Sequence, residues 1–365
     1  MPERRGHEAI VVGAGIIGLA CAWRARQRGL SVLVVDRAAP GAGASSVAAG
    51  MLAPVTEADF GEEELLRLNL EALRLWPAFV EELGGELHYR PTGALVVAAD
   101  RDDAEELHRL HEFQRSLGLE AEWLTPTECR RVEPGLAPRV AGGILAPQDH
   151  HVDPVAVVQA LVDKGIEVRA GDAAVAVDEH GVRLASGARL PAEQVVIAAG
   201  SWSGSGIDGL PDLPVRPVKG QILSLRRPPA RPLADHLIRT PRCYVVDRGD
   251  GRVVVGATVE ERGFDTHVTA DGVYRLLEAA WEVLPDIGEL EFERAQAGLR
   301  PGTPDNAPLI GRGEPPNVIW ATGNYRNGVL HAPIAADAVA ELLTGGEPLA
   351  AVAPFAPERF GVGVP

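Results

Sequence analysis

A glycine-rich turn between two apolar runs near the start of the chain constrains the fold more than any other feature of the sequence. The residues Gly13-Ala14-Gly15-Ile16-Ile17-Gly18 follow a short apolar run and open a proline-free segment at 16–28. A second apolar run, at 30–36, ends in Asp36. Continuous apolar runs are typical of parallel strands that helices cover on both faces. The order therefore predicts a strand, a helix and a second parallel strand, with the glycines in the first turn.

Each glycine of this turn has a physical task in a nucleotide-binding unit. Gly13 allows the tight turn, Gly15 lets the backbone approach a pyrophosphate, and Gly18 lets the helix pack against the strand. The helix N-terminus offers free N–H groups and a positive dipole end to phosphates. Asp36, 18 residues beyond Gly18, can accept hydrogen bonds from ribose hydroxyls, and its charge disfavours the 2′-phosphate of NADP. The alternative is a cluster of packing glycines, and the pattern does not distinguish FAD from NAD.

Further parts of a nucleotide-binding domain alternate with strand-rich stretches along the chain. A buried strand is predicted at 194–200, and a strand at 318–322 leads through Gly323 into a helix at about 328–343. Between them, a hairpin at 243–256 precedes an amphipathic helix at 269–284. We therefore expect a mixed α/β and α+β architecture with two interleaved domains. The predicted nucleotide-binding domain comprises 7–83, 147–214 and 299–350, and a mainly antiparallel β substrate domain comprises 84–146 and 215–298.

Composition excludes several classes of partner. Acidic residues outnumber basic ones, 51 against 35, and the formal net charge of −16 repels phosphate backbones and anionic lipids. The three cysteines are scattered without CxxC spacing, which argues against a disulfide framework or a zinc ribbon and fits a reducing cytoplasm. His150, His151 and Asp153 could suggest a metal site, but Asp153 before Pro154 fits a helix N-cap better. We predict no metal.

Two further segments resemble those of a known family. Residues 43–52, Gly-Ala-Ser-Ser-Val-Ala-Ala-Gly-Met-Leu, resemble the flavin-proximal segment of the D-amino acid oxidase-like FAD-dependent oxidoreductases. The stretches Ala297-Gly298-Leu299-Arg300-Pro301 and 321–328 are similar to motifs of the branch that contains the glycine oxidases of thiamine biosynthesis. The resemblance runs from about residue 8 to 345. It implies FAD in a Rossmann-type domain that is interleaved with the antiparallel substrate domain. We expect the FAD to be non-covalent, because none of the three cysteines lies in a segment that resembles a flavin attachment site.

The resemblance implies FAD contacts when it is carried over position by position. Val175 is expected on the adenine side, and 324–330 around the flavin ring. From the residues alone, 323–328 is a glycine-bounded turn into a helix whose N-terminus favours an anionic reduced flavin, with an ordinary helix cap as the alternative. The residues expected to bind FAD are Gly13, Gly15, Ile16, Ile17, Gly18, Asp36, Arg37, Ala44, Ser45, Ala49, Gly50, Met51, Val175, Asn324, Tyr325, Arg326, Asn327, Gly328, Val329 and Leu330.

The resemblance also implies substrate contacts at Tyr244, Arg300 and Arg326. Arg300 lies in an apolar β context, and its planar guanidinium suits bidentate binding of a carboxylate. The alternative for Arg300 is a structural salt bridge, and for Tyr244 it is core packing. The backbone carbonyl of Arg326 could matter more than its side chain. We assign no catalytic acid or base, because holding the neutral amine and the C–H bond in line with the flavin can suffice.

Two positions leave the preferred substrate open, and the role of a third is open too. Val259 stands where the family pattern has a Met, and Arg242 where it has a His. Both are expected near the pocket. Lys219 is interpreted as a solvated strand end, with a position near the flavin as the alternative.

The sequence thus predicts FAD-dependent oxidative deamination of glycine and small amino acids or amines to the imine, with O₂ reduced to H₂O₂. The imine would hydrolyse to glyoxylate and ammonia or supply thiazole assembly, with thiazole synthase as a partner. The rivals are a related sarcosine, D-amino acid or secondary-amine oxidase or dehydrogenase, and a nucleotide-binding sensor without turnover. We expect a cytoplasmic homo-oligomer that binds neither nucleic acid nor membrane.

Overall fold

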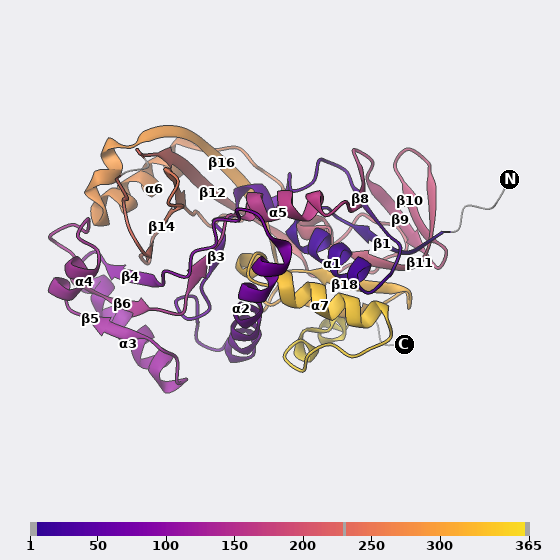
Figure 1. Ribbon diagram of the computed structural model, residues 1–365, viewed down its shortest axis with the longest axis horizontal. Coiled ribbons are helices and arrows are strands. Elements are labelled where there is room, and N and C mark those ends of the chain that lie inside the picture. The colour runs from indigo at the N-terminus through magenta and orange to yellow at the C-terminus, as the bar shows by residue number, and fades with distance from the viewer. Residues whose placement is uncertain (1–5, 229–230, 362–365) are drawn as a thin grey trace.

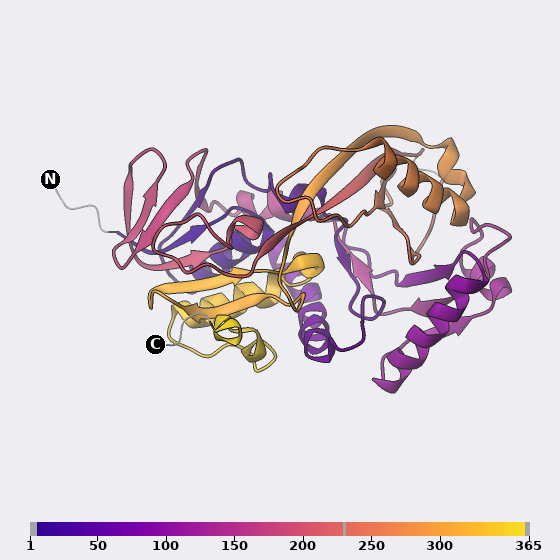
Figure 2. The same cartoon turned by 180° about the vertical axis from the view of Figure 1, so that it is seen from behind.

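Two large β-sheets, each with helices packed on it, make up most of the molecule. The computed structural model describes residues 6–228 and 231–361. Figure 1 shows one sheet towards each end of the long axis, with the N- and C-termini both near the end that carries β1, β11 and β18. Seen from behind, α3 and α6 lie at the opposite end (Figure 2). The chain passes between the two ends several times, so segments distant in sequence meet where the sheets adjoin.

The centre of the first sheet consists of parallel strands, and the N-terminal βαβ unit supplies two of them. Its order is β17-β18-β11-β1-β2-β8, parallel from β18 to β8, while β17 is antiparallel and β9 and β10 extend β11 as an antiparallel ribbon. The strands are β1 (His7–Val12), β2 (Val32–Asp36), β8 (Glu167–Ala170), β9 (Ala174–Asp178), β10 (Gly181–Leu184), β11 (Arg189–Ile197), β17 (Leu309–Gly313) and β18 (Val318–Thr322).

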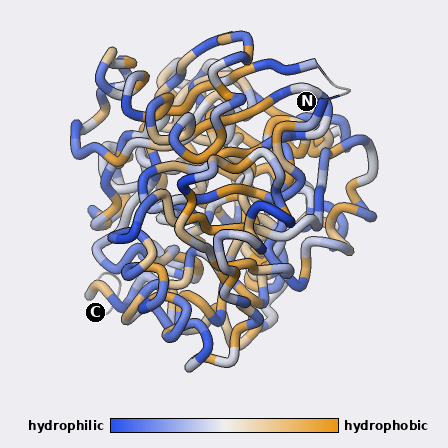
Figure 3. Tube along the Cα trace, turned by 90° about the vertical axis from the view of Figure 1, so that its left-hand side faces the viewer, coloured by the Kyte–Doolittle hydropathy of each residue, from blue (hydrophilic) through white to orange (hydrophobic). Residues whose placement is uncertain are grey.

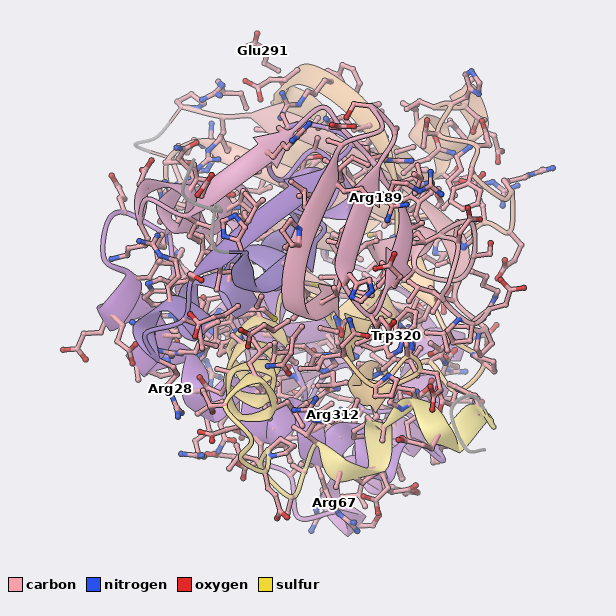
Figure 4. The ribbon with its side chains drawn as sticks, turned by 90° about the vertical axis from the view of Figure 1, so that its right-hand side faces the viewer. Arg28, Arg67, Arg189, Glu291, Arg312 and Trp320 are labelled. Atoms are coloured by element: carbon pink, nitrogen blue, oxygen red, sulfur yellow. The ribbon has the colours of Figure 1, made fainter. Side chains whose placement is uncertain are left out.

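Both faces of this sheet are covered, which explains the unbroken apolar runs. Ala9 and Val11 of β1 pack with the helices in one core, and Ile10 and Val12 face a second core on the other side. The covering helices are α1 (Ile16–Gln27), α2 (Glu63–Leu83), α5 (Pro154–Asp163) and α7 (Ala332–Leu343). Figure 3 shows apolar stretches concentrated in the interior and hydrophilic ones in many outer loops. Trp320, labelled in Figure 4, is fully buried, while Arg67 and Glu291 point outward.

The second sheet is antiparallel except for one pair, and helices pack on it at α6 and, over β4 and β6, at α3. Its order is β16-β12-β15-β14-β13-β4-β6-β5, with β13 and β4 parallel. Apolar residues of α6 (Ala270–Val283) pack with those of β12 in one core. The strands are β4 (Ala94–Ala98), β5 (Glu122–Leu124), β6 (Gly142–Ala146), β12 (Arg216–Arg226), β13 (Leu237–Arg239), β14 (Tyr244–Asp247), β15 (Arg252–Gly256) and β16 (Glu291–Gly302).

Short elements connect and cap these layers. A two-stranded ladder pairs β3 (Met51–Leu52) with β7 (His150–His151). The remaining helices are α3 (Arg101–Ser116), α4 (Pro126–Val132) and the 3₁₀ turns η1 (Ala44–Val47), η2 (Gly200–Trp202), η3 (Pro285–Glu289), η4 (Tyr325–Asn327), η5 (Ala353–Phe355) and η6 (Pro357–Phe360). None of the helices among the described residues has the length and apolarity to cross a bilayer.

The two sheets take their strands from alternating parts of the chain. β16 runs from Glu291 to Gly302 and crosses the predicted boundary between 298 and 299, so this boundary falls inside a strand. The hairpin predicted at 243–256 is the β14–β15 pair, and the helix predicted at 269–284 is α6. We propose that each sheet with its helices is the core of one domain, in the interleaved division predicted above.

Candidate active site

A cavity of about 920 Å³ lies where the two sheets meet. The first sheet contributes the carboxyl ends of β1, β2 and β18 and the residues just after β11, the edge at which open parallel sheets bind ligands. The second sheet contributes residues of β12, β14, β15 and β16. The cavity has the size range of a cofactor or small-molecule site.

The glycine turn has the geometry that a phosphate needs. Gly13 has φ +114°, and a Cβ there would lie 2.3 Å from the carbonyl oxygen of Ala198. Helix α1 begins at Ile16 without a side-chain cap on Gly15, and a Cβ on Gly15 would approach only the Ser45 hydroxyl, at 3.4 Å. Gly18 does not line the cavity, because it packs against the turn: its Cβ would lie 1.9 Å from the Gly13 carbonyl oxygen. The N-terminus of α1 faces the cavity, where its Ile16 N–H donates to the Ser45 hydroxyl at 3.0 Å.

Asp36 is fixed at the cavity wall by backbone donors. Its carboxylate accepts hydrogen bonds from the N–H groups of Ala14, at 2.6 Å, and Ala38, at 2.7 Å. Each carboxylate oxygen retains further acceptor capacity. The side chain is thus held beside the glycine turn with room to accept from a ribose. Its neighbour Arg37 also lines the cavity and lies over the Trp202 ring, 3.5 Å from the ring centroid.

The segment 44–51 lines the middle of the cavity and is clamped from the second sheet. Gly50 has φ +74°, and a Cβ there would lie 1.9 Å from the Val152 carbonyl oxygen. The buried guanidinium of Arg248 donates to the carbonyl oxygens of Val152, at 2.6 Å, and Ala49. Burial lowers the pKa of Arg248 to about 10, so it stays charged at neutral pH. Arg248 could not be predicted from the sequence, because its partners are backbone atoms almost 100 residues or more away.

The stretch 323–330 places an unpaired acceptor in the cavity wall. Asn324 is buried and lines the cavity, and its Oδ1 has no hydrogen-bond partner within the described parts of the chain. Tyr325, Arg326, Gly328 and Val329 also line the cavity. Asn327 and Leu330 are buried behind it, outside the lining.

The expected helix N-terminus at 328 is wrong by about four residues. The 3₁₀ turn η4 comes first, and α7 begins at Ala332 with Pro333 in its first turn. Proline is favoured there because the first helical N–H groups lack partners inside the helix.

Arg300 and Tyr244 lie at the opposite end of the cavity, each flat against a glycine. The Arg300 Nη1 group donates to the carbonyl oxygens of Thr258, at 3.1 Å, and Lys219, at 3.4 Å. A Cβ on Gly220 would come within 2.3 Å of the Arg300 guanidinium. Among residues 6–228 and 231–361, no carboxylate forms an ion pair with Arg300, so the structure does not bear out the salt-bridge alternative.

Tyr244, on β14, also lies against a glycine, as Arg300 does. A Cβ on Gly256 would lie 2.4 Å from its hydroxyl oxygen. Burial raises the pKa of Tyr244, so its hydroxyl keeps its proton at neutral pH. A glycine inside a strand pattern indicates that other atoms approach the strand closely. The sequence therefore marks Gly220 and Gly256 as sites of close packing, but it does not show that Arg300 and Tyr244 are the side chains that pack there.

A buried carboxylate that was not predicted from the sequence also lines this end of the cavity. The Glu57 side chain is 7% exposed, and its Oε1 lies 3.5 Å from Arg239 Nη1. Arg239, which lines the cavity too, donates to the carbonyl oxygen of Thr56 at 2.9 Å. Glu57 is therefore paired rather than free. It stands in an irregular stretch after the family motif, where no periodicity marks it.

Three further lining residues surround the mouth of the cavity. Arg326 is exposed, with its guanidinium 5.1 Å from the centroid of the Tyr325 ring. Arg242 forms an ion pair with Glu282 and is about half exposed, and Val259 is 61% exposed. The positions that depart from the family pattern thus lie at the solvent side of the cavity, away from the glycine turn.

The interpretation of Lys219 as a solvated strand end is wrong. Its side chain is 1% exposed, and Nζ lies 2.7 Å from Asp265 Oδ2 and 3.5 Å from Glu260 Oε2. The hydrogen bond from Lys219 holds the pKa of Asp265 well below its usual range. The error arose because β12 is covered by a loop that comes some 40 residues later in the chain, which strand patterning cannot reveal.

Asp153 and its histidine neighbours have structural roles. Asp153 caps α5 by accepting the Val155 N–H, and His150 hydrogen-bonds to the Tyr89 hydroxyl at 2.6 Å. Burial lowers the pKa of His151 to about 3. In the part of the chain that the structure describes, no group of three His, Cys, Asp or Glu side chains is arranged to hold a metal ion.

The comparison with known families decides the cofactor. A family model described as FAD dependent oxidoreductase matches residues 8–342. The chain belongs to this family. FAD is its cofactor, and the cavity fits FAD: a helix N-terminus in the cavity wall for the pyrophosphate, a fixed carboxylate for a ribose and an unpaired buried acceptor at Asn324 for a ring N–H.

Individual relatives of the chain give a finer comparison. The chain is 32% identical to the glycine oxidase of Geobacillus kaustophilus, covering 97% of both chains. A crystal structure of glycine oxidase from that organism superposes with a TM-score of 0.89, covering 97% of this chain and 98% of that one. The chain is also 34% identical to the bifunctional protein ThiO/ThiG of Synechocystis over 97% of its own length, and spans about half of that protein, 54%.

Proposed function

We propose that this protein oxidises glycine and other small α-amino acids or amines to the imine, with FAD as cofactor and O₂ as electron acceptor. The imine then hydrolyses to glyoxylate and ammonia, and O₂ becomes H₂O₂. One observation carries the proposal. Arg300 presents a guanidinium to the cavity without an acidic partner in the described residues, next to the half-buried Tyr244. The full-length similarity to glycine oxidase supports the same substrate class.

The substrate carboxylate binds to Arg300 in this proposal. Nη1 is engaged by two carbonyl oxygens, which leaves Nε and Nη2 as donors for a carboxylate within the described structure. The Tyr244 hydroxyl is protonated at neutral pH and adds a third donor. A substrate as small as glycine offers few other contacts, so these donors set its orientation. Fixing its Cα–H bond towards the cofactor supplies a large part of the rate, because orientation removes an entropic barrier.

The other cavity residues hold the cofactor. The 13–17 turn and Asp36 would bind the pyrophosphate and ribose, Val175 the adenine side, and Asn324 with its neighbours the flavin ring. When bound, FAD accepts a hydride equivalent from the substrate Cα and passes the electrons to O₂. Glu57 is paired with Arg239, and we assign it no proton transfer. Positioning by Arg300 and Tyr244 is thus the chemistry that this chain's own side chains contribute.

A second candidate is a secondary amine such as sarcosine or D-proline. Val259 is exposed at the mouth of the cavity, and Arg326 and Arg242 line the same side. A substituent on the amine nitrogen could therefore extend towards solvent past the valine.

The cellular setting is part of the proposal. The bifunctional ThiO/ThiG relatives, of which this chain spans about half, support an association with a second activity. We propose thiazole synthase as that partner, with the imine supplied for thiamine biosynthesis. The three cysteines are free and buried, in keeping with a cytoplasmic protein. A homo-oligomer stays a prediction, which light scattering on the purified protein tests.

A spectroscopic experiment tests the proposed function. The purified protein should be yellow, and glycine should bleach the flavin band anaerobically, with the colour restored by air and H₂O₂ formed. Sarcosine, D-alanine and D-proline are compared at equal concentrations. Bleaching by sarcosine or D-proline but not by glycine would favour the second candidate. A yellow protein that no amine bleaches would refute turnover and leave a nucleotide-binding sensor.

A further inference from the structure

A loop of the second sheet covers part of the cavity. We call residues 257–268, between β15 and α6, the strap. Its residues Val259 and Phe264 line the cavity. The Phe264 ring stacks on Trp202, with 5.3 Å between centroids, and Trp202 in turn carries the guanidinium of Arg37. The strap thus reaches from the second sheet to the wall beside the predicted ribose site.

A buried lysine ties the strap down. The Lys219 ammonium contacts two strap carboxylates, Asp265 at 2.7 Å and Glu260 at 3.5 Å. The backbones of Lys219 and Glu260 also exchange two hydrogen bonds of 2.9 Å. A buried ammonium is stable only with such partners, so lifting the strap requires that both ion pairs be broken and the ammonium be hydrated instead. Lys219 itself does not line the cavity, and therefore does not touch the substrate.

The contacts between Lys219 and the strap also hold Arg300 in place. The guanidinium donates to the carbonyl oxygens of Thr258 and Lys219, at 3.1 and 3.4 Å. The first carbonyl belongs to the strap, and the second to the residue whose backbone pairs with Glu260. The Thr258 hydroxyl also donates to Glu260, at 2.6 Å. Any displacement of the strap therefore moves an acceptor that holds Arg300.

We propose that Lys219 is a positioning residue: it holds the strap closed over the cavity and thereby fixes the Arg300 guanidinium for the substrate carboxylate. The part that concerns the carboxylate rests on the proposed function, while closure of the strap does not. Opening separates the ammonium from Asp265 and Glu260, so it must expose Lys219. Exposure of this one amine is then a direct measure of the opening.

The first experiment measures that exposure. The chain has two lysines, Lys164 and Lys219, and Lys164 is exposed. The purified yellow protein is treated with an N-hydroxysuccinimide acetylating reagent, and both sites are followed by mass spectrometry. Lys164 should react quickly and Lys219 far more slowly. Asp265→Asn should raise the Lys219 rate at least about 10-fold, because one of its two anionic partners is gone, a tenfold change being 1.4 kcal/mol.

A matched control is Asp271→Asn, just beyond the strap. Asp271 is exposed and pairs with Arg275 within α6, and this variant should leave the Lys219 rate unchanged. Asp265 is one-third exposed, so Asp265→Asn should fold, whereas the more drastic Lys219→Met could fail to. If the Asp265→Asn protein loses its fold or its FAD, the contacts between Lys219 and the strap serve overall stability, and the proposal is overturned.

The second experiment tests whether the strap acts through Arg300. Asp265→Asn should lower kcat/KM for glycine about 10- to 100-fold, the effect of misplacing a positioning group by about 1 Å. In an Arg300→Ala background the same change should have almost no further effect, because coupled residues are not additive. Full additivity would overturn the proposal, as would an unchanged Lys219 rate in Asp265→Asn. If glycine is not oxidised at all, the proposed function fails while the acetylation rates still decide whether the strap opens.

Discussion

Replacement of Arg300 by alanine tests the substrate site most directly. In the structure its Nη1 group is held by the carbonyl oxygens of Thr258 and Lys219, and its remaining donors have no acidic partner among the described residues. The alanine variant leaves a bound carboxylate with the Tyr244 hydroxyl as its main donor. Gly220, under the guanidinium, and the glycine turn at the other end of the cavity remain unchanged. The substitution should therefore affect substrate binding and leave FAD in place.

The magnitude follows from the loss of a buried charge pair. Removing one partner of such a hydrogen-bonded pair costs about 2–5 kcal/mol. At 1.4 kcal/mol per decade, kcat/KM for glycine should fall roughly 30- to 5,000-fold. Arg300→Lys keeps the charge without the planar fork and should lie between the wild type and the alanine variant. Gly220→Ala keeps Arg300 but places a Cβ within 2.3–2.5 Å of three guanidinium atoms, so kcat/KM should fall in the same direction.

The assay is O₂ uptake over a range of glycine concentrations, with FAD content measured from the visible spectrum. Arg294→Ala is the matched control, because Arg294 lies exposed on the same strand. It should retain the wild-type kcat/KM. The reasoning is refuted if Arg300→Ala oxidises glycine as fast as the wild type does. A variant that folds poorly or loses FAD would instead show that Arg300 is structural.

Three further predictions concern the cofactor and the core. FAD should be non-covalent, because the three cysteines are buried and lie outside segments that resemble flavin attachment sites. Acid precipitation should therefore release all yellow colour into the supernatant as FAD. A yellow pellet, or FMN in the supernatant, would contradict this prediction. Asp36→Ala should weaken FAD binding by about 1.5–3 kcal/mol, measured by titrating the apoprotein, and full occupancy after dialysis of a dilute sample would place Asp36 away from the ribose. His331 is buried with its Nε2–H donating to Asn69, and burial lowers its pKa from 6.5 to about 3. Because the unfolded state takes up this proton first, the free energy of unfolding should decrease as the pH falls below 6.5, by about 1.4 kcal/mol per pH unit. Urea unfolding at pH 6.5 and 5 should show a smaller decrease for His331→Gln than for the wild type. The exposed His180→Gln variant should show the same decrease as the wild type.

Local patterns in the sequence were sufficient to predict the parts of the fold that depend on short-range rules. The turn at Gly13 needs a left-handed φ and a close backbone approach, and glycine is the residue that permits both. The hairpin β14–β15, the cap at Asp153 and the amphipathic α6 follow from turn chemistry and from apolar periodicity. Family motifs then placed Arg300 and Tyr244 in one cavity with the glycine turn. Each of these features is encoded within a few residues.

Only the tertiary structure decided which charged groups are paired and which are free. Lys219 looks like a surface residue until the strap, some 40 residues later, covers it and supplies Asp265. Arg248 clamps the segment near Gly50 through backbone oxygens that no side-chain pattern announces. Arg300 was as compatible with a salt bridge as with a substrate, and whether an acidic side chain pairs with it, which none among the described residues does, depends on the packing of two sheets. The physical reason is that burial of a charge depends on partners that the fold brings together from distant positions, whereas backbone conformation depends on neighbours in the chain.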